Sequence, residues 1–135
     1  MINCTTGEAV LGGISFSTQL TRKSFENSRD FLNAKVLSSN DSWISYVINF
    51  AQGYVVAKFR GEKLSSLMIG FNLPDENLQG GWESWSQENE RKRKQLHDQI
   101  LREELGAISR SFSWGEVGSV VDPKTCDSSI FVQYV

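Results

Sequence analysis

Apolar and polar side chains alternate in three consecutive stretches in the middle of the chain. These stretches are residues 42–50 (SWISYVINF), 54–60 (YVVAKFR) and 63–71 (KLSSLMIGF). A repeat of two positions is typical of a β-strand that buries one of its faces. The connections are short and contain Gly53 and Gly61. The pattern therefore predicts an antiparallel meander of three strands, with Lys58 and Arg60 on the outward face.

Two further pairs of strands are predicted near the ends of the chain. EAVL and ISFS flank Gly12-Gly13, a pair that suits a primed hairpin turn. Residues 111–135 are typical of two strands on either side of a turn that contains Asp122-Pro123. The whole chain, residues 1–135, is thus expected to form a single α+β domain, with an antiparallel sheet of about six or seven strands.

A short helix is predicted near residues 22–29. Thr21 has the side chain of a helix N-cap, and Leu20 and Phe25 have the spacing of a hydrophobic staple.

A long helix is predicted over about residues 85–105. Ser84 and Gln87 have the spacing of a capping box, which places the helix start near Trp85, and Gly106 is suited to the position just after the helix. At about 100° per residue, one stripe of this helix contains Trp85, Asn89, Arg93, Leu96 and Ile100. We expect the apolar members of the stripe to pack on the sheet, against Ile48, Phe59 or Ile69.

The other face of the long helix is strongly charged. Ten residues in a row, 86–95, have no apolar side chain. Acidic residues precede basic ones by four positions, the order that stabilises a helix, in the pairs Glu88/Lys92, Glu90/Lys94 and Asp98/Arg102. Within the stripe, Arg93 is expected either to reach solvent, to stack on a tryptophan, or to form a partly buried ion pair with a carboxylate from the sheet.

Composition narrows the class of protein. The net charge is −2 and the isoelectric point is near 5.4, which argues against a nucleic-acid partner. No apolar run approaches the roughly 20 residues that span a membrane, and the first residues lack the features of a secretory signal. Cys4 and Cys126 lie far apart and have no metal-type spacing. A cytoplasmic protein with two free thiols is therefore expected.

Candidate chemistry is sparse. His97 is the single histidine, and no carboxylate lies three or four positions away on its helix to orient it as a general base. No nucleophile-elbow, Walker A or dinucleotide-binding motif occurs. We therefore expect no catalytic residue, cofactor or metal site, and an unrecognised hydrolase is left as a remote alternative.

The most informative charge pattern lies in residues 72–90. This segment has five carboxylates and no Lys or Arg, and it contains two tryptophans. Acidic side chains around a large aromatic residue are suited to binding a basic protein partner. The expected contacts are Asp75, Glu76, Trp82, Glu83, Glu88 and Glu90. The alternative is that both tryptophans belong to the core and that the acidic residues only keep a loop solvated.

The second half of the chain also resembles a known group of proteins. The residues that carry this resemblance are WESWSQENERKRKQLHD at 82–98, LG at 105–106, WG at 114–115, VVDP at 120–123 and SSIFVQY at 128–134. They resemble a family of small bacterial cytoplasmic proteins that have a W-x-x-W helix, a Trp-Gly strand start and a closing strand that ends in Tyr. That family looks like the orphan immunity proteins of polymorphic and contact-dependent growth-inhibition toxin systems. Cys126 departs from the family, whose last turn usually has small residues.

The resemblance implies a protein that binds a cognate toxin domain, often a nuclease, and blocks its active site without any catalysis. The acidic segment 72–90 would then complement a basic nuclease groove. A small protein-interaction module unrelated to toxins is the alternative function. No membrane partner is expected.

Overall fold

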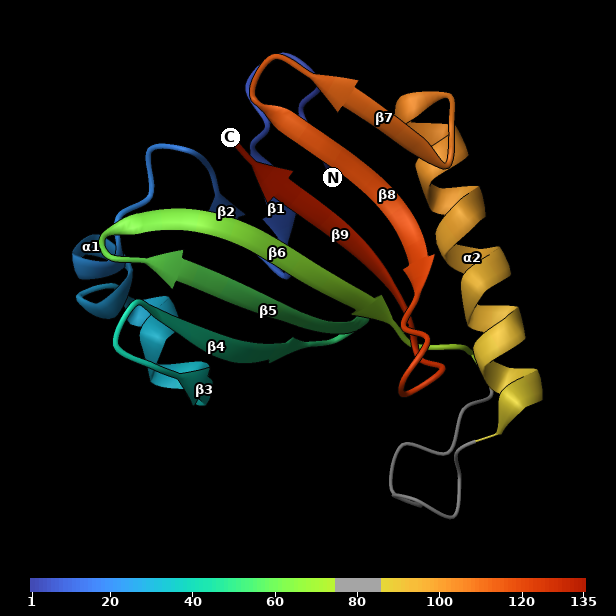
Figure 1. Ribbon diagram of the computed structural model, residues 1–135, viewed down its shortest axis with the longest axis horizontal. Helices are drawn as coiled ribbons and strands as arrows, with labels where there is room; N and C mark the ends of the chain where they lie inside the picture. Colours follow the sequence, from blue (N-terminus) through green and yellow to red (C-terminus); the bar gives the residue numbers. More distant parts are fainter. Residues whose placement is uncertain (75–85) are drawn as a thin grey trace.

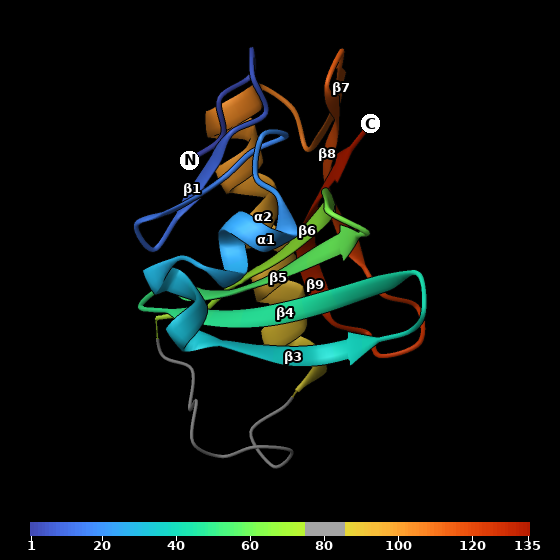
Figure 2. The same ribbon diagram turned by 90° about the vertical axis from the view of Figure 1, so that its left-hand side faces the viewer.

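The computed structural model describes residues 1–74 and 86–135, which form one α+β domain around a strongly twisted antiparallel sheet (Figures 1 and 2). The sheet has seven strands in the order β3-β4-β5-β6-β9-β8-β7. Their bounds are β3 Ala34–Ser39, β4 Trp43–Phe50, β5 Gly53–Arg60, β6 Lys63–Phe71, β7 Ser109–Phe112, β8 Gly115–Val121 and β9 Ser128–Tyr134. The expected fold class is confirmed, and β4, β5 and β6 form the predicted meander.

Two strands of this sheet were not predicted. β3 and β7 lie at the two edges of the sheet, where a strand pairs with one neighbouring strand only. β3 is exposed along almost its whole length, so its sequence shows no alternation of apolar and polar residues.

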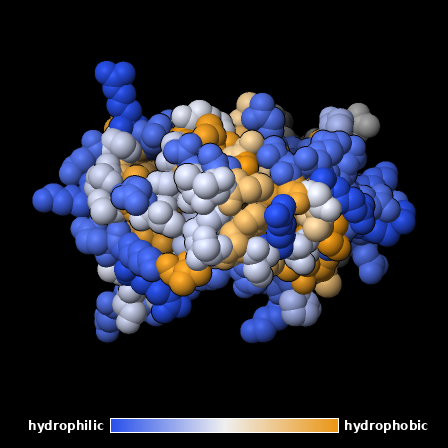
Figure 3. Space-filling model, turned by 90° about the horizontal axis from the view of Figure 1, so that it is seen from above, coloured by the Kyte–Doolittle hydropathy of each residue, from blue (hydrophilic) through white to orange (hydrophobic). Residues whose placement is uncertain are grey.

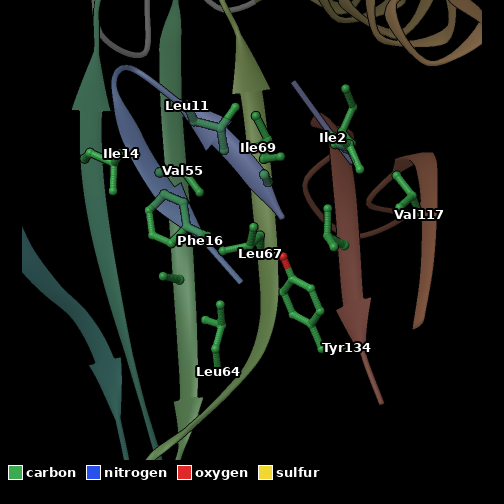
Figure 4. Close-up of a cluster of buried hydrophobic side chains, with 14 of the residues drawn as sticks. Ile2, Leu11, Ile14, Phe16, Val55, Leu64, Leu67, Ile69, Val117 and Tyr134 are labelled. Atoms are coloured by element: carbon green, nitrogen blue, oxygen red, sulfur yellow. The ribbon is translucent and has the colours of Figure 1, made fainter. Parts of the chain in front are cut away.

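The N-terminal hairpin forms a separate two-stranded sheet from β1 (Ala9–Leu11) and β2 (Ile14–Phe16). Gly12 and Gly13 have φ angles of +58° and +82°, as the predicted primed turn requires. The hairpin lies over β5 and β6, and the side chains of Leu11 and Phe16 point toward Val55 and Leu67 (Figure 4). All four side chains are buried, so this hairpin closes the core on one face of the main sheet.

The short helix α1 covers Arg22–Glu26 and is followed by a 3-10 helix, η1, at Arg29–Asn33. It is shorter than the predicted 22–29. Thr21 is its N-cap, as predicted, and accepts a hydrogen bond from the backbone N–H of Ser24. The ring of Phe25 is fully buried and lies 5.6 Å from that of Phe59 on β5 and 5.5 Å from that of Tyr46 on β4.

The long helix α2 covers Gln87–Leu105. Its N-cap is Ser86, whose side chain accepts a hydrogen bond from the backbone N–H of Asn89. The prediction of a helix start near Trp85, capped by Ser84, was therefore wrong by two residues. Two serines stand two positions apart here, and the sequence pattern did not distinguish them. The end of the helix is as predicted, with Gly106 at φ +80°.

The predicted buried stripe of α2 was also wrong in detail. The buried residues are Glu90, His97, Leu101 and Leu105, whereas Leu96 and Ile100 are only half-buried. The helix packs chiefly against β8 and β9 (Figure 1), not against the region of Ile48 or Phe59. Hydrophobic periodicity missed this orientation because two of the inward side chains are polar.

The charged residues of α2 pair with one another, but with other partners than predicted. The ion pairs along the helix are Glu88–Arg91, Glu90–Arg93 and Lys94–Asp98. Two of these three pairs span three positions instead of four. At both spacings the side chains lie on one side of the helix, so the charge pattern predicted that ion pairs form but not which residues pair.

Candidate partner-binding surface

The residues predicted to contact a partner fall into two groups. Asp75, Glu76, Trp82 and Glu83 lie outside the described residues. Glu88 and Glu90 both lie in the first turn of α2, where a negative charge is favoured by the helix dipole. Their surroundings differ.

Glu88 is exposed and forms two hydrogen bonds with the Arg91 guanidinium, from Nε at 3.2 Å and from Nη2 at 2.6 Å. This contact lowers the pKa of the Glu88 carboxyl. Since both side chains are more than half exposed, a partner can reach the carboxylate without moving the helix.

Glu90 is only 8% exposed and belongs to the junction between helix and sheet. Its carboxylate accepts hydrogen bonds from Nε of Arg93, the shorter at 2.9 Å, and Nη1 of Arg93 donates to the carbonyl oxygen of Phe71 at 2.6 Å. Arg93 thus forms the partly buried ion pair considered among the alternatives, but its carboxylate comes from the helix and not from the sheet. Glu90 holds Arg93 in place over the end of β6.

His97 completes this junction. Its Nε2 lies 3.1 Å from the backbone nitrogen of Phe71, and its Nδ1 lies 2.8 Å from Oγ of Ser128 on β9. Because the N–H of Phe71 donates to Nε2, the neutral ring must carry its proton on Nδ1. Burial, and then the positive charge of Arg93, lowers the pKa of His97 to about 4. The ring is fully buried and both nitrogens are engaged, so it offers no accessible base.

The face of the sheet opposite α2 and the hairpin presents a row of apolar side chains. In the strand register Val47 pairs with Val56, Val56 with Met68, and Met68 with Phe131, so the row crosses β4, β5, β6 and β9. We call this surface the open face. Lys58 and Arg60 were predicted on this face, but the apolar row was not. The sequence does contain an indication of it, because Val47, Val56 and Met68 are apolar residues at positions where the alternating pattern predicts polar ones.

A groove of about 850 Å³ lies on the open face between these strands and the β8–β9 turn. The ring of Tyr54 lies over Gly70, and the ring of Phe131 lies over Gly118, because a Cβ added at either glycine would overlap the ring. Both rings line the groove, together with Met68 and Asp127. A second groove, of about 610 Å³, lies between the start of α2 and the same turn, and it includes Glu88.

The β8–β9 turn that separates the two grooves has a constrained backbone. The carboxylate of Asp122 accepts hydrogen bonds from the backbone N–H groups of Lys124 and Thr125. Cys126 has a φ angle of +62° and is the single non-glycine residue with positive φ among residues 1–74 and 86–135. Such a conformation is unfavourable for a residue with a Cβ, so the turn is held by its hydrogen bonds.

Other kinds of site find little support in the described part of the chain. There, no three His, Cys, Asp or Glu side chains are grouped in a way that could hold a metal ion. No helix among the described residues is both long and apolar enough to cross a membrane. Hydrophobic and hydrophilic residues share the surface. In the view from above, the hydrophobic ones gather near the middle and the hydrophilic ones lie at both ends (Figure 3).

No protein-family model matches the sequence, and no curated protein sequence matches it. Among solved structures, the fold is similar to that of a chain in the complex of Rhs1-CT with its cognate immunity protein RhsI1. The superposition has a TM-score of 0.62 and covers 98% of this chain and 85% of that chain, with 15% sequence identity. At this identity the likeness establishes the fold alone, and it extends over the whole domain.

Proposed function

We propose that the protein is an immunity protein, which binds a cognate bacterial toxin domain in the cytoplasm and neutralises it by stoichiometric contact. The observation that carries this proposal is the similarity of fold, over nearly the whole chain, to a chain of a toxin–immunity complex. The resemblance of residues 82–134 to orphan immunity proteins supports the same conclusion independently of the fold.

The surface described above fits a protein partner better than a small substrate. Along the open face a row of apolar side chains crosses four strands, and Met68 in this row is 45% exposed. Apolar surface of this kind is typical of protein interaction sites. The two grooves are shallow depressions on either side of one turn. His97 is buried between helix and sheet, where a substrate could not reach its ring. The proposed function requires no catalysis.

We further propose that the toxin domain is a nuclease with a basic groove, and that the acidic segment 72–90 faces it. Glu88 stands exposed at the start of α2, next to the positions of Asp75, Glu76, Trp82 and Glu83 in the sequence. Opposite charges on the two surfaces would accelerate the encounter and orient the partners. Glu90 contributes by holding Arg93 and the start of the helix, and not by direct contact.

Co-expression tests the proposal. The C-terminal domain of the protein encoded directly upstream of this gene, where a toxin is expected, is expressed from an inducible promoter, with and without this protein, and growth and co-purification are measured. Rescue of growth together with capture of the toxin domain is expected. Capture of a neighbouring protein that has no effect on growth would favour the alternative function, a protein-interaction module unrelated to toxins.

A further inference from the structure

The groove on the open face combines an apolar floor with a negatively charged rim. Tyr54, Met68 and Phe131 line it, and Asp122, Lys124 and Asp127 of the β8–β9 turn border it. Met68 is 45% exposed, a large fraction for an apolar side chain near the centre of a sheet. No element within residues 1–74 and 86–135 covers it.

One carboxylate of the rim is available to a ligand. The side chain of Asp122 is used within the turn, where it accepts two backbone hydrogen bonds. Asp127 forms no ion pair with any of the described residues, and neither does Lys124. Tyr54 and Asp127 both line the groove. Burial raises the pKa of the Tyr54 hydroxyl, the charge of Asp127 raises it further, and the charge of Arg93 lowers it. The rim thus carries two negative charges against one positive charge.

This arrangement is suited to a long basic side chain. The methylene groups of an arginine can lie on apolar surface while its guanidinium reaches a carboxylate at the rim. A guanidinium also stacks favourably on an aromatic ring such as that of Tyr54. A purely apolar side chain would leave Asp127 facing it without a partner, which is costly once water is excluded.

We propose that the groove receives a basic side chain, an arginine above all, from the toxin domain, and that the toxin therefore occupies the open face as well as the start of α2. This inference rests on the proposed function and names the surface and the chemistry by which the partner binds. In it, Met68 and Phe131 contact the aliphatic part of the incoming side chain, and Asp127 binds its charged end. A second copy of this chain fits less well, because a face-to-face dimer brings the carboxylates of two identical rims together.

The test uses the purified toxin domain encoded directly upstream and measures its affinity for two groove variants, Met68→Glu and Asp127→Lys. Each has a matched control outside the groove. Leu37→Glu places the same charge on an apolar side chain of β3 that is 57% exposed, and Asp41→Lys reverses an exposed charge in the β3–β4 turn. Both groove variants are expected to weaken binding by about tenfold or more, and both controls to change it by less than about twofold.

A footprinting measurement on the wild-type protein tests the same contact without any substitution, so it remains informative if a variant fails to fold. The chain has two methionines, Met1 and Met68, and an exposed thioether is oxidised by peroxide. In the complex, oxidation of Met68 should slow by about tenfold or more relative to the free protein, whereas Met1, whose side chain is 10% exposed, should be oxidised slowly and at the same rate in both states. This result, or the selective loss of affinity in the groove variants, supports the inference.

Four results would overturn the inference. Groove variants that fold and bind as the wild type does, or equal oxidation of Met68 in the free and bound protein, would leave the proposed function standing and place the interface elsewhere. A free protein that is dimeric with Met68 already protected would assign the groove to a second copy. Failure of the wild-type protein to bind the toxin domain would remove the proposed function and the inference together.

Discussion

The Nδ1 atom of His97 on α2 lies 2.8 Å from Oγ of Ser128 at the start of β9. The same ring accepts a hydrogen bond from the backbone N–H of Phe71 at the end of β6. One neutral imidazole therefore joins the helix to two neighbouring strands of the sheet. This junction sets the position of the first turns of α2, where the proposed contact region begins.

The junction makes stability depend on pH. The pKa of His97 is lowered from 6.5 to about 4 in the folded protein, because the ring is buried and the charges of Arg93 and Lys94 oppose its protonation more than the carboxylate of Asp98 favours it. Between these two values the unfolded chain binds a proton that the folded chain does not, so stability falls as the pH falls from about 6.5 to about 4. The total loss is roughly 3 kcal/mol.

Urea unfolding at a series of pH values measures this loss. A His97→Gln variant, which has no titrating ring, serves as control and should lose the slope in this window, although it is less stable at pH 7. Nuclear magnetic resonance provides a direct check, because the chain has a single histidine. Titration of that ring near pH 6.5 in the folded protein would contradict the assignment.

Glu90 and Glu88 provide a matched pair of substitutions on the same helical turn. Glu90→Gln removes the negative charge from an ion pair in which the Arg93 side chain is 12% exposed, and it should cost about 3 kcal/mol of stability because a mostly buried charge pair is broken. Glu88→Gln removes an ion pair that is more than half exposed and screened by solvent, so the stability should hardly change. Chemical denaturation of the two variants gives both values. Equal costs would show that Glu90 is not part of the helix–sheet junction.

Neutralising the acidic segment should affect the rate of association more than the stability of the complex. The variant carries Asp75→Asn, Glu76→Gln and Glu83→Gln. Opposite charges at the rim of an interface accelerate encounter, and salt screens them. We expect slower association and a weaker dependence on salt concentration in stopped-flow measurements, with little change in dissociation. Association at the wild-type rate would exclude this segment from the interface and leave the open face and the β8–β9 turn as the contact surface.

Trp82 is predicted to be an anchor of the interface. Replacing it with alanine should weaken binding by about 2 kcal/mol, since buried aromatic residues commonly dominate interface energetics. Thermal unfolding of the free variant is the control. A large decrease in its melting temperature would mean that Trp82 belongs to the core of the free protein, as in the alternative considered for the two tryptophans.

Local sequence patterns predicted the fold well for elements that have one buried face and one exposed face. β4, β5 and β6 bury one face each, so alternation marked them within a residue or two at each end. Gly12 and Gly13 specified their turn because only residues that tolerate positive φ fit it. The edge strand β3 and the placement of β9 beside β6 were not predictable in this way. The first has no buried face, and the second depends on a pairing between segments far apart in the sequence.

The helix–sheet junction was missed for a different reason. Glu90 and His97 are polar residues that the hydrophobic pattern places at the surface, yet both are buried because Arg93, Ser128 and the backbone of Phe71 satisfy them. The partners of Glu90 and His97 belong to three separate elements, and they lie near these two residues only after the chain has folded. The row of Val56, Met68 and Phe131 was not predicted because each strand contributes one residue to it, and the row forms only when the three strands pair.

A titration of toxin activity tests the central claim most directly. A fixed concentration of the purified toxin domain is mixed with increasing amounts of this protein, and the remaining toxin activity is measured at equilibrium. Stoichiometric neutralisation predicts a linear decrease that reaches zero when the two proteins are equimolar, without chemical change of the toxin domain. Complete loss of activity at a small fraction of one equivalent would indicate catalysis, and full activity in the presence of excess protein would contradict the account.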